Sequence, residues 1–420
     1  MRERSRKLAW NLRREGSECM KKLLFVINTL GYGGAERAML DLFEAIKNES
    51  YDISLFVLTG QGELICELPS HIHLLNQNYS DISVLTDEGR KQLIKSVLQA
   101  GIGKGLFVRR FGYLIKNLVR MIDQKHVQAD KLCWRILADG APVFPQEYDL
   151  AVAYLEGGST YYVADHVRAK KKVAFVHIDY VQAGYNRSLD QGCYEKFDRI
   201  FTVSDEVKES FLKVYPEYQY KVSVFNNLIN RSRIERMSLE GEGYEDQFTG
   251  YRILTIGRLA QQKRYDVAIE TMKLLKQKTD VPVRWYVLGE GELRNKLEGM
   301  IRKYGLQNDF ILEGVKTNPF PYYRNCDLYV HATGYEGKSI AIQEAQVLGK
   351  AVLATDCTGN REQIRQGIDG RLCALDPDVI SDEIVWMIKH PNQCMEYGKQ
   401  AQKRVLYQSH GLEEMKGMLR

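Results

Sequence analysis

Two glutamates separated by seven residues stand in the segment that is richest in chemistry, GYEGKSIAIQEAQVLGKAVLATD (334–356). Glu336 falls in a predicted loop, and Glu344 falls in a helix predicted to begin near Ser339. The backbone N–H groups of the intervening Gly-Lys-Ser-Ile would point out of the helix N-terminus, where the partial positive charge favours a phosphate. Carboxylates beside such a pocket suit hydroxyl groups of a ribose or a sugar. Taken alone, the pattern also fits a helix-start carboxylate and a solvated one.

Two cations stand about eighty residues upstream, in IGRLAQQKRYDVAIE (256–270). Arg258 and Lys263 follow a predicted strand and a glycine, Gly257, and they precede an amphipathic helix. Two fixed cations in a loop of this kind would neutralise a diphosphate and stabilise it as a leaving group. Alone, an arginine and a lysine in a loop are usually solvated.

A glycine-rich turn, GYGGAER (31–37), follows the first apolar run of the chain. Gly33 and Gly34 have no Cβ, so their backbone could closely approach an anion or an acceptor. Their spacing does not match the dinucleotide-binding pattern G-x-G-x-x-G, which argues against an NAD(P)-dependent oxidoreductase. His177 ends another predicted strand and is therefore placed at the same cleft, either as a structural residue or as a site residue.

Short apolar runs alternate with helical patterns in both halves of the chain, as parallel α/β units do. The runs are nearly continuously apolar, which is typical of strands covered by helices on both faces. We therefore predict an α/β fold with two Rossmann-like, doubly wound domains that face a cleft. The predicted strands are 23–28, 52–58, 148–155, 172–178, 199–204 and 221–225, then 252–257, 283–289, 309–314, 327–332, 351–355 and 370–374.

A chain of 420 residues exceeds what one hydrophobic core usually supports. A polar stretch with three glycines, 229–251, is typical of a linker between two domains. We predict a basic N-terminal extension, an acceptor domain, a nucleotide-sugar domain and a C-terminal helix that returns toward the acceptor domain. Their bounds are 1–20, 21–235, 236–397 and 398–420. The extension lacks the apolar core of a secretory signal, and it is either a short basic helix or a stretch ahead of a translation start at Met20.

The composition of the chain indicates where in the cell the protein works and which kinds of partner it could bind. Eight scattered cysteines without a C-x-x-C pair favour reduced thiols and a cytoplasmic protein. Because no apolar run approaches the roughly 18 residues of a membrane span, membrane contact would be peripheral. The stretch 90–135 holds eleven Lys and Arg against two Asp, interleaved with apolar residues. Such a basic amphipathic segment either lies on an anionic membrane or packs on the first domain with its charges solvated. No recognised nucleic-acid motif accompanies the charge.

Several segments together resemble a known family. IGRLAQQKRYDVAI, VLGEGELRNKLE, LEGV, YEGKSIAIQEAQVLGKAVLATD and GIDGRL are similar to the C-terminal domain of retaining GT-B glycosyltransferases of family 4, which includes bacterial sugar-polymer synthases. The resemblance covers about 250–375 and extends into the first half through INTLGYGGAERAMLDL.

The resemblance implies a role for each matching residue. Arg258 and Lys263 would hold the nucleotide diphosphate, Glu344 would bind the ribose, and Glu336 would contact the donor sugar. His177 matches the first-domain histidine near that sugar. Among the remaining donor-binding positions, the turn at 314–316 would be the place where the edge of the base is read. These positions are Gly33, Gly34, Gly257, Gly314, Val315, Lys316, Gly337, Lys338, Ser339 and Ile340. Lys338 and Arg264 depart from the usual family pattern, which leaves the donor sugar open.

The activity that the resemblance implies is retaining, metal-independent transfer of a hexose from a nucleotide diphosphate sugar, expected to be a UDP-sugar. The acceptor would be a cell-surface polysaccharide, such as a capsule or exopolysaccharide, or a lipid-linked glycan at the inner face of the cell membrane. No cofactor besides the donor is implied. The leaving diphosphate would itself take the proton of the attacking hydroxyl. Two alternatives stay open: an NAD(P)-dependent Rossmann oxidoreductase, and a non-catalytic membrane-surface protein on a transferase scaffold.

Overall fold

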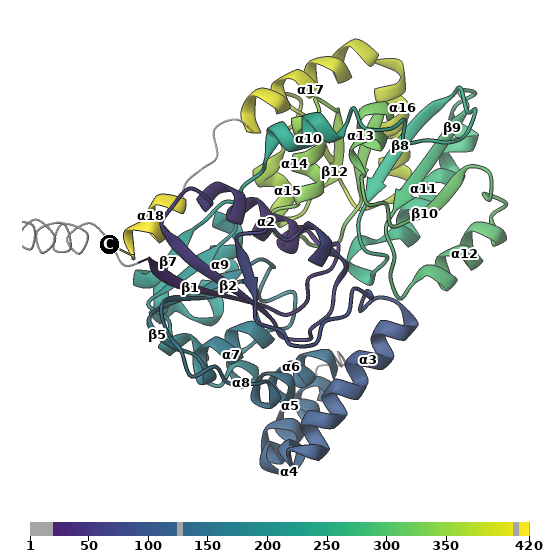
Figure 1. Ribbon diagram of the computed structural model, residues 1–420. Helices are drawn as coiled ribbons and strands as arrows, with labels where there is room; N and C mark the ends of the chain where they lie inside the picture. Colours follow the sequence, from purple (N-terminus) through teal and green to yellow (C-terminus); the bar gives the residue numbers. More distant parts are fainter. Residues whose placement is uncertain (1–19, 124–128, 406–410, 420) are drawn as a thin grey trace, which may run out of the picture.

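Two parallel β-sheets organise the computed structural model, which describes residues 20–123, 129–405 and 411–419 (Figure 1). The first sheet has seven strands in the order β3-β2-β1-β4-β5-β6-β7, and the second has six in the order β10-β9-β8-β11-β12-β13. The strands are β1 Lys21–Ile27, β2 Tyr51–Val57, β3 Ile72–Leu74, β4 Glu147–Ala153, β5 Arg168–Val176, β6 Arg199–Thr202, β7 Val222–Val224, β8 Tyr251–Ile256, β9 Val283–Leu288, β10 Phe310–Gly314, β11 Leu328–His331, β12 Val352–Thr355 and β13 Arg371–Cys373. The predicted fold class is thereby confirmed.

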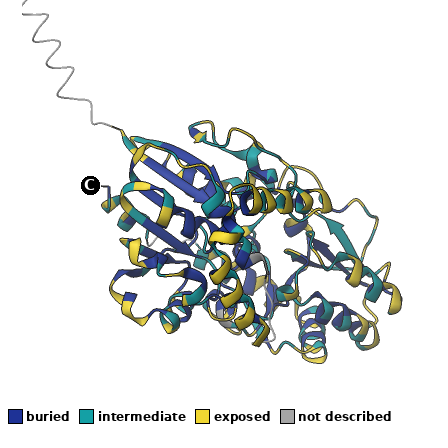
Figure 2. Cartoon of the chain, turned by 90° about the horizontal axis from the view of Figure 1, so that it is seen from below, coloured by how far each residue is buried: buried dark blue, intermediate teal, exposed yellow. Residues whose placement is uncertain are grey.

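Helices cover both faces of each sheet, so the strands form the interior (Figure 2). Successive side chains of β1 enter different clusters: Leu24 packs on one face, whereas Leu23 and Phe25 pack on the other. The α-helices are α2 Gly34–Ile46, α3 Asp87–Leu98, α4 Leu106–Arg109, α5 Phe111–Asp123, α6 Ala129–Gly140, α7 Gly158–His166, α8 Arg187–Asp190, α9 Asp205–Val214, α10 Arg231–Met237, α11 Tyr265–Lys278, α12 Arg294–Lys303, α13 Phe320–Asn325, α14 Ile340–Val347, α15 Thr358–Gln363, α16 Pro377–Lys389, α17 Pro391–Val405 and α18 Leu412–Gly417. Within the described ranges, none of these is long and apolar enough to cross a bilayer.

Every predicted strand range overlaps a strand, and one strand, β3, was not predicted. It has three residues and pairs along one side only, with β2, as an edge strand. Ile72 is buried while His73 is exposed, so the segment has no continuous apolar run that could mark it in the sequence.

The chain passes between the halves twice. The predicted linker 229–251 contains α10, whose Ile234 packs into the apolar cluster beside the second sheet. Near the C-terminus, α17 contacts α14 of the second half, and α18 then lies against the first sheet, where Met415 is fully buried (Figure 1). The predicted C-terminal segment 398–420 thus begins inside α17. Residues 1–19 of the predicted extension lie outside the described residues.

Two helix pairs join the halves directly: α2 contacts α14, and α9 contacts α15. At the second contact, the backbone N–H of Glu206 donates to Oε1 of Glu362 at 2.6 Å. Nearby, Nζ of Lys338 donates to Oδ1 of Asn226 at 2.7 Å. Loops from both sheets therefore meet beside the start of α14.

Candidate active site

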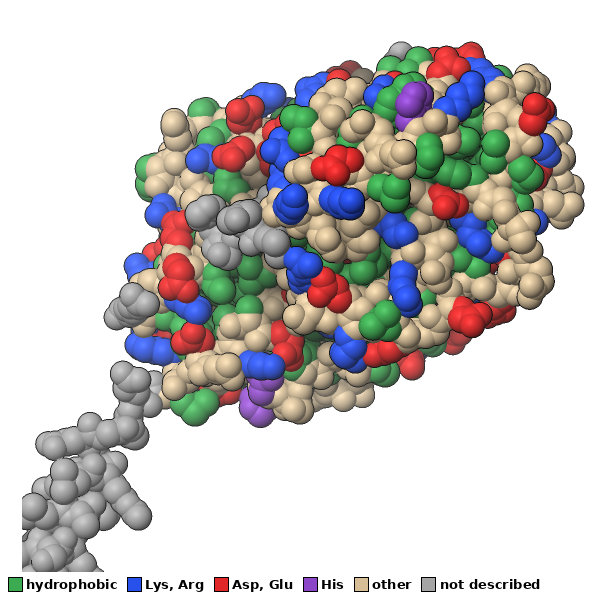
Figure 3. Space-filling view, turned by 90° about the horizontal axis from the view of Figure 1, so that it is seen from above, with side chains coloured by type: hydrophobic (Ala, Val, Ile, Leu, Met, Phe, Trp, Pro, Cys, Tyr) green, Lys and Arg blue, Asp and Glu red, His purple; other side chains and the backbone are tan. Residues whose placement is uncertain are grey.

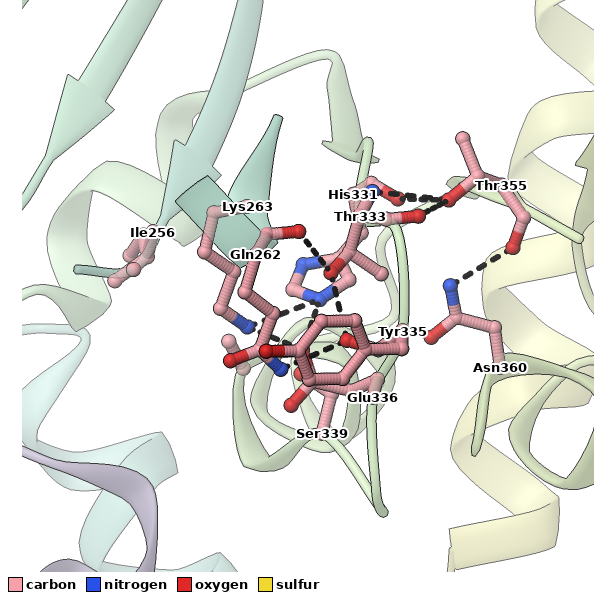
Figure 4. Close-up of polar contacts among 12 residues, drawn as sticks. Ile256, Gln262, Lys263, His331, Thr333, Tyr335, Glu336, Ser339, Thr355 and Asn360 are labelled. Atoms are coloured by element: carbon pink, nitrogen blue, oxygen red, sulfur yellow. Dashed lines mark hydrogen bonds and ion pairs between the residues drawn. The ribbon is translucent and has the colours of Figure 1, made fainter. Parts of the chain in front are cut away.

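A lysine, a glutamate and a histidine form a polar cluster at the carboxyl ends of β8 and β11 (Figure 4). Lys263 Nζ donates to Oε2 of Glu336, and Nε2 of His331 lies 3.2 Å from the same oxygen. The Lys263 and Glu336 side chains are only 17% and 15% exposed. The fold therefore brings together the residues predicted to hold the diphosphate and the sugar.

The charges in this cluster have defined states. Burial alone would raise the pKa of Glu336, but the Lys263 ammonium and the hydrogen bond with His331 lower it to about 2. Burial, followed by the nearby Lys263 charge, lowers the pKa of His331, so its ring is neutral at neutral pH. With its proton on Nε2, the ring donates to Glu336 and accepts from the Tyr329 hydroxyl, 3.2 Å from Nδ1. The contacts from Lys263 and from His331 are both made to Oε2 of Glu336, not to Oε1.

Hydrogen bonds hold the two loops of the cluster in register (Figure 4). The Gln262 side-chain amide donates to the carbonyl of Tyr335 at 2.7 Å. In return, the Gln262 carbonyl accepts from the Thr333 hydroxyl at 3.0 Å and from the Gly334 N–H at 2.8 Å. Glu336 is thus fixed relative to Lys263 by backbone as well as by charge.

Arg264 has the left-handed backbone conformation that favours glycine, with φ +45°. Arg264 is one of the two positions, with Lys338, at which the sequence departs from the pattern of the family that it resembles. The side chain is held by Asp266, whose Oδ1 lies 3.1 Å from Nε. The turn that leads into α11 therefore keeps its shape with an arginine in it.

Arg258 is exposed on the same loop as Lys263 and faces the first half of the molecule. Burial raises the pKa of Glu36 in α2, and the charge of Arg258 opposes that shift. The Glu36 carboxylate also accepts from the Thr29 hydroxyl at 3.2 Å. Gly257, next to Arg258, accepts from the Tyr265 hydroxyl at 2.9 Å through its carbonyl. Glu36, an acidic residue of the GYGGAER turn, thus lies across from Arg258, which is predicted to bind the diphosphate.

The glycines of that turn lie where the halves meet. A Cβ on Gly34 would be 3.5 Å from the Ile340 side chain at the start of α14. A Cβ on Gly33 would overlap the Glu36 carboxylate. In the second half, a Cβ on Gly337 would overlap the carbonyl oxygen of His177. Gly34 and Gly337 therefore allow the backbone of one half of the molecule to approach the other half closely.

In the segment before α14, the backbone of Ser339 and the side chain of Lys338 already make hydrogen bonds within the protein. The Ser339 N–H donates to Oε1 of Gln363, and the Gln363 amide donates back to the Ser339 carbonyl, both at 2.7 Å. Burial lowers the pKa of Lys338 to about 8, and its ammonium reaches Asn226 of the first half. The Ser339 N–H is therefore not available to an anion in this conformation.

Glu344 is buried on α14 at the contact with α2. Its Oε2 accepts from the Tyr323 hydroxyl at 3.1 Å. Burial raises its pKa to about 7, although the charges of Arg37 and Arg233 oppose the rise. The Glu344 carboxyl therefore keeps its proton to a higher pH than an ordinary glutamate does. A ribose hydroxyl that donates to this carboxylate would favour the ionised form.

The turn after β10 carries the residues predicted to read the base edge, Gly314 to Lys316. Gly314 has φ +75° and its carbonyl accepts from the Gly289 N–H at 2.8 Å. Val315 is 40% exposed, and Lys316 pairs with Glu313 at 2.9 Å. Main-chain groups at the tip of this turn are therefore presented outward.

His177 has one ring nitrogen without a hydrogen-bond partner among the described residues. Its backbone N–H donates to Oε2 of Glu156 at 3.0 Å. Burial lowers the ring pKa to about 3, so the imidazole is neutral at physiological pH. Its Nε2 is buried, and among the described residues it has no hydrogen-bond partner. A neutral ring nitrogen without a partner is equipped to bind a hydroxyl.

Sequence reasoning missed His331, although the signal was present. The residue ends a predicted strand, as His177 does, but it stands inside an apolar run and looks like a core residue. The importance of Glu36 and Arg37 was missed as well, since only the three-dimensional contact of α2 with α14 reveals it. Among the described residues there is no group of three or more His, Cys, Asp or Glu that could hold a metal ion.

Comparison with known proteins shows which family the second half is similar to. Residues 246–404 match the family model described as glycosyl transferases group 1. An uncharacterized glycosyltransferase of Methanocaldococcus jannaschii is 30% identical over 175 residues, 40% of this chain and 42% of the relative. An N-acetylgalactosamine-N,N'-diacetylbacillosaminyl-diphospho-undecaprenol 4-alpha-N-acetylgalactosaminyltransferase of Campylobacter jejuni is 29% identical over 192 residues, 46% of this chain and 50% of the relative. The matches thus span half or less of these relatives.

Comparison of structures extends over both halves. A mutant of Staphylococcus aureus TarM in complex with Fondaparinux, alpha-GlcNAc-glycerol and UDP has a TM-score of 0.66 at 13% identity and covers 96% of this chain and 100% of that one. At this identity the likeness shows the fold alone. The chain therefore has the two-sheet GT-B fold, and its residues 246–404 match the model of the glycosyl transferases group 1 family.

Proposed function

We propose that this protein is a retaining glycosyltransferase that moves a hexose from a UDP-sugar to a lipid-linked glycan or a cell-surface polysaccharide. The observation that carries the proposal is the contact of Lys263, Glu336 and His331 at the mouth of the group 1 domain. The name of the Campylobacter jejuni relative describes transfer to an undecaprenol-linked acceptor, and the TarM structure contains UDP. Both support the choice of donor and acceptor class.

Lys263 and Arg258 serve the leaving group in this proposal. The β-phosphate would lie against the Lys263 ammonium, with the exposed Arg258 closing over the diphosphate. Because cations in a site sheltered from water stabilise developing charge strongly, this electrostatic term would carry most of the catalysis. The departing phosphate oxygen would accept the proton of the attacking hydroxyl on the same face of the sugar, which retains the configuration.

Glu336 and His177 orient the donor sugar. Oε1 of Glu336 and Nε2 of His177 belong to different halves, and Gly337, the neighbour of Glu336, packs on the His177 carbonyl. Each could bind a sugar hydroxyl from its own side. Glu344 would bind the ribose, and the turn Gly314 to Lys316 the base edge. No step in this scheme uses a metal.

A thermal-shift panel tests the donor assignment. Purified protein is heated with UDP, GDP, ADP, NAD or NADP, each with and without EDTA. We expect the melting temperature to rise with UDP and to stay constant with NAD and NADP. A rise with NAD or NADP alone would indicate an oxidoreductase, and a rise that EDTA abolishes would contradict metal independence.

A further inference from the structure

Five apolar side chains point outward from α4 and α5, at the lower end of the molecule in Figure 1. Their spacing of three and four residues places them along one side of the helices. On the other side of α5, Tyr113 and Met121 are buried and pack in a cluster with Leu189. The exposed fractions of the outward residues are Val108 83%, Phe111 63%, Val119 60%, Ile122 59% and Ile115 44%. We call these five residues the outer stripe.

The outer stripe decides between two interpretations of the basic segment 90–135. An apolar face that packs on the first domain accounts for Tyr113 and Met121. It does not account for the outer stripe, because these residues lie on the uncovered side. Exposed apolar residues are ordinary when scattered, but a contiguous row on one helix face marks a contact surface.

Positive charge accompanies the outer stripe. Arg109, Lys116 and Arg120 are exposed on the same two helices, and in the described part of the chain none of them has an ion-pair partner. On the opposite face of the molecule, basic and acidic side chains are interspersed (Figure 3). An apolar row with cations beside it is complementary to the interface of an anionic bilayer.

A basic cavity of about 370 Å³ opens beside the outer stripe. It is lined by Arg109, Arg110, Arg135, Asp139, Asp165, His166 and Gln191. The two carboxylates are already engaged: Asp139 binds Arg110 Nε at 2.6 Å, and Asp165 binds Arg135 Nη1 at 2.7 Å. Arg109, which lines the cavity and is exposed, adds a cation without a described partner.

Arg135 is a buried cation in this cavity. It is 1% exposed, and its Nη2 donates to the Asp190 carbonyl at 3.0 Å. Its Nε is buried and, among the described residues, has no hydrogen-bond partner. An unpartnered buried donor is costly. Three arginines against two carboxylates leave the cavity with a net positive charge, which suits a phosphate group.

We propose that the outer stripe inserts into the interface of a membrane and that the cavity behind Arg109 receives the phosphate of an anionic phospholipid. Arg109 connects the two features, since it follows Val108 of the stripe and lines the cavity. The residues involved are separate from the candidate active site. The inference adds a lipid site to the proposed transferase and can fail or hold independently of it.

Vesicle flotation tests this with the full chain. The vesicles contain phosphatidylcholine alone or phosphatidylcholine with phosphatidylglycerol, and the variants are F111S/I115S/V119S and Arg109→Gln. Their controls are L239S/V281S/Y220S, at exposed apolar positions elsewhere, and Arg324→Gln, at an exposed arginine of the second half. We expect binding to the anionic vesicles to fall about tenfold or more for the stripe variant. It should fall about fivefold for Arg109→Gln.

Other outcomes would overturn the proposal. Equal binding to both vesicle types, or Arg109→Gln binding that matches Arg324→Gln, would exclude the head-group site. Stripe-variant binding equal to its control would exclude insertion. Inorganic phosphate that raises the melting temperature through Arg109, with no vesicle binding, would indicate a free anion as the ligand. Release of UDP by each variant is measured in parallel, so a loss of transfer is distinguished from a loss of lipid binding.

Discussion

Single residues of the site are held in charge states that the fold imposes. Glu336 keeps its charge beside Lys263, whereas burial raises the pKa of Glu344 to about 7. The two glutamates are separated by seven residues, and no feature of the sequence distinguishes their titration. A cation in contact outweighs burial and lowers the pKa of Glu336, whereas burial raises the pKa of Glu344 because the Tyr323 hydroxyl and the more distant arginines offset it only in part.

The raised pKa of Glu344 predicts a pH-dependent stability difference. A carboxyl with a folded pKa of about 7 and a usual value of 4.5 binds more protons in the folded state between those pH values. The free energy of unfolding therefore falls as pH rises from about 4.5 to about 7, and this loss stays constant above. Glu344→Gln has no carboxyl at this position, so its free energy of unfolding should not show this loss. Measured by urea unfolding, the stability of the variant relative to wild type should therefore increase by about 1–3 kcal/mol between pH 5 and pH 8.

A control and a second readout sharpen this test. Glu292→Gln, at an exposed glutamate of the same domain, should show a difference from wild type that does not change with pH. Glu344→Gln should also bind UDP more weakly, because an amide accepts ribose hydroxyl hydrogen bonds less strongly than a carboxylate. A parallel pH dependence in wild type and Glu344→Gln would refute the titration of this residue.

At the scale of elements, backbone packing between loops positions the site. A Cβ on Gly359 of α15 would overlap the carbonyl of Gly337 and approach that of Glu336, so α15 lies directly on the loop that carries the predicted sugar ligand. Both carbonyls are backbone groups, so neither can rotate away as the end of a flexible side chain could. The loop can therefore move aside only by shifting Glu336 away from Lys263.

Gly359→Ala is expected to disturb stability and turnover together. We expect the free energy of unfolding to fall by about 2 kcal/mol or more, as for other overpacked interior positions. UDP release from a UDP-sugar should fall at the same time. Gly299→Ala is the matched control, because this glycine lies in α12 with open space around it, and alanine there should be neutral or slightly stabilising. An unaltered melting temperature for Gly359→Ala would show that α15 does not hold the loop.

The elements themselves were largely predictable, and their contacts were not. Strands of a doubly wound sheet are buried on both faces, so β1 or β12 appears in the sequence as an unbroken apolar run. The short edge strand β3 lacks such a run, and α10 is hidden in a polar stretch that was predicted as a linker. Lys263 and Glu336 could be predicted from loop positions and family resemblance. His331, Glu36 and the Lys338 contact with Asn226 depend on how segments from both halves meet.

The whole molecule combines two halves that touch through α2 with α14 and α9 with α15, and a C-terminal helix, α18, that returns to the first sheet. The proposed donor site belongs to the second half, and His177 and the GYGGAER turn bring residues of the first half to it. The outer stripe lies on helices of the first half. Membrane contact through that half would leave the second half, which carries the proposed donor site, in the aqueous phase.

The most direct test of the central claim is nucleotide release by the purified chain. Wild type, Lys263→Ala and the control Lys296→Ala, at an exposed lysine of the same domain, are incubated with UDP-hexoses and UDP-N-acetylhexosamines and a lipid-linked glycan fraction, with EDTA present. We predict acceptor-dependent UDP release by wild type and Lys296→Ala, reduced about 100-fold or more in Lys263→Ala, and a product with the anomeric configuration of the donor. Release that is equal in Lys263→Ala, or absent with every UDP-sugar in a protein that binds UDP, would contradict it.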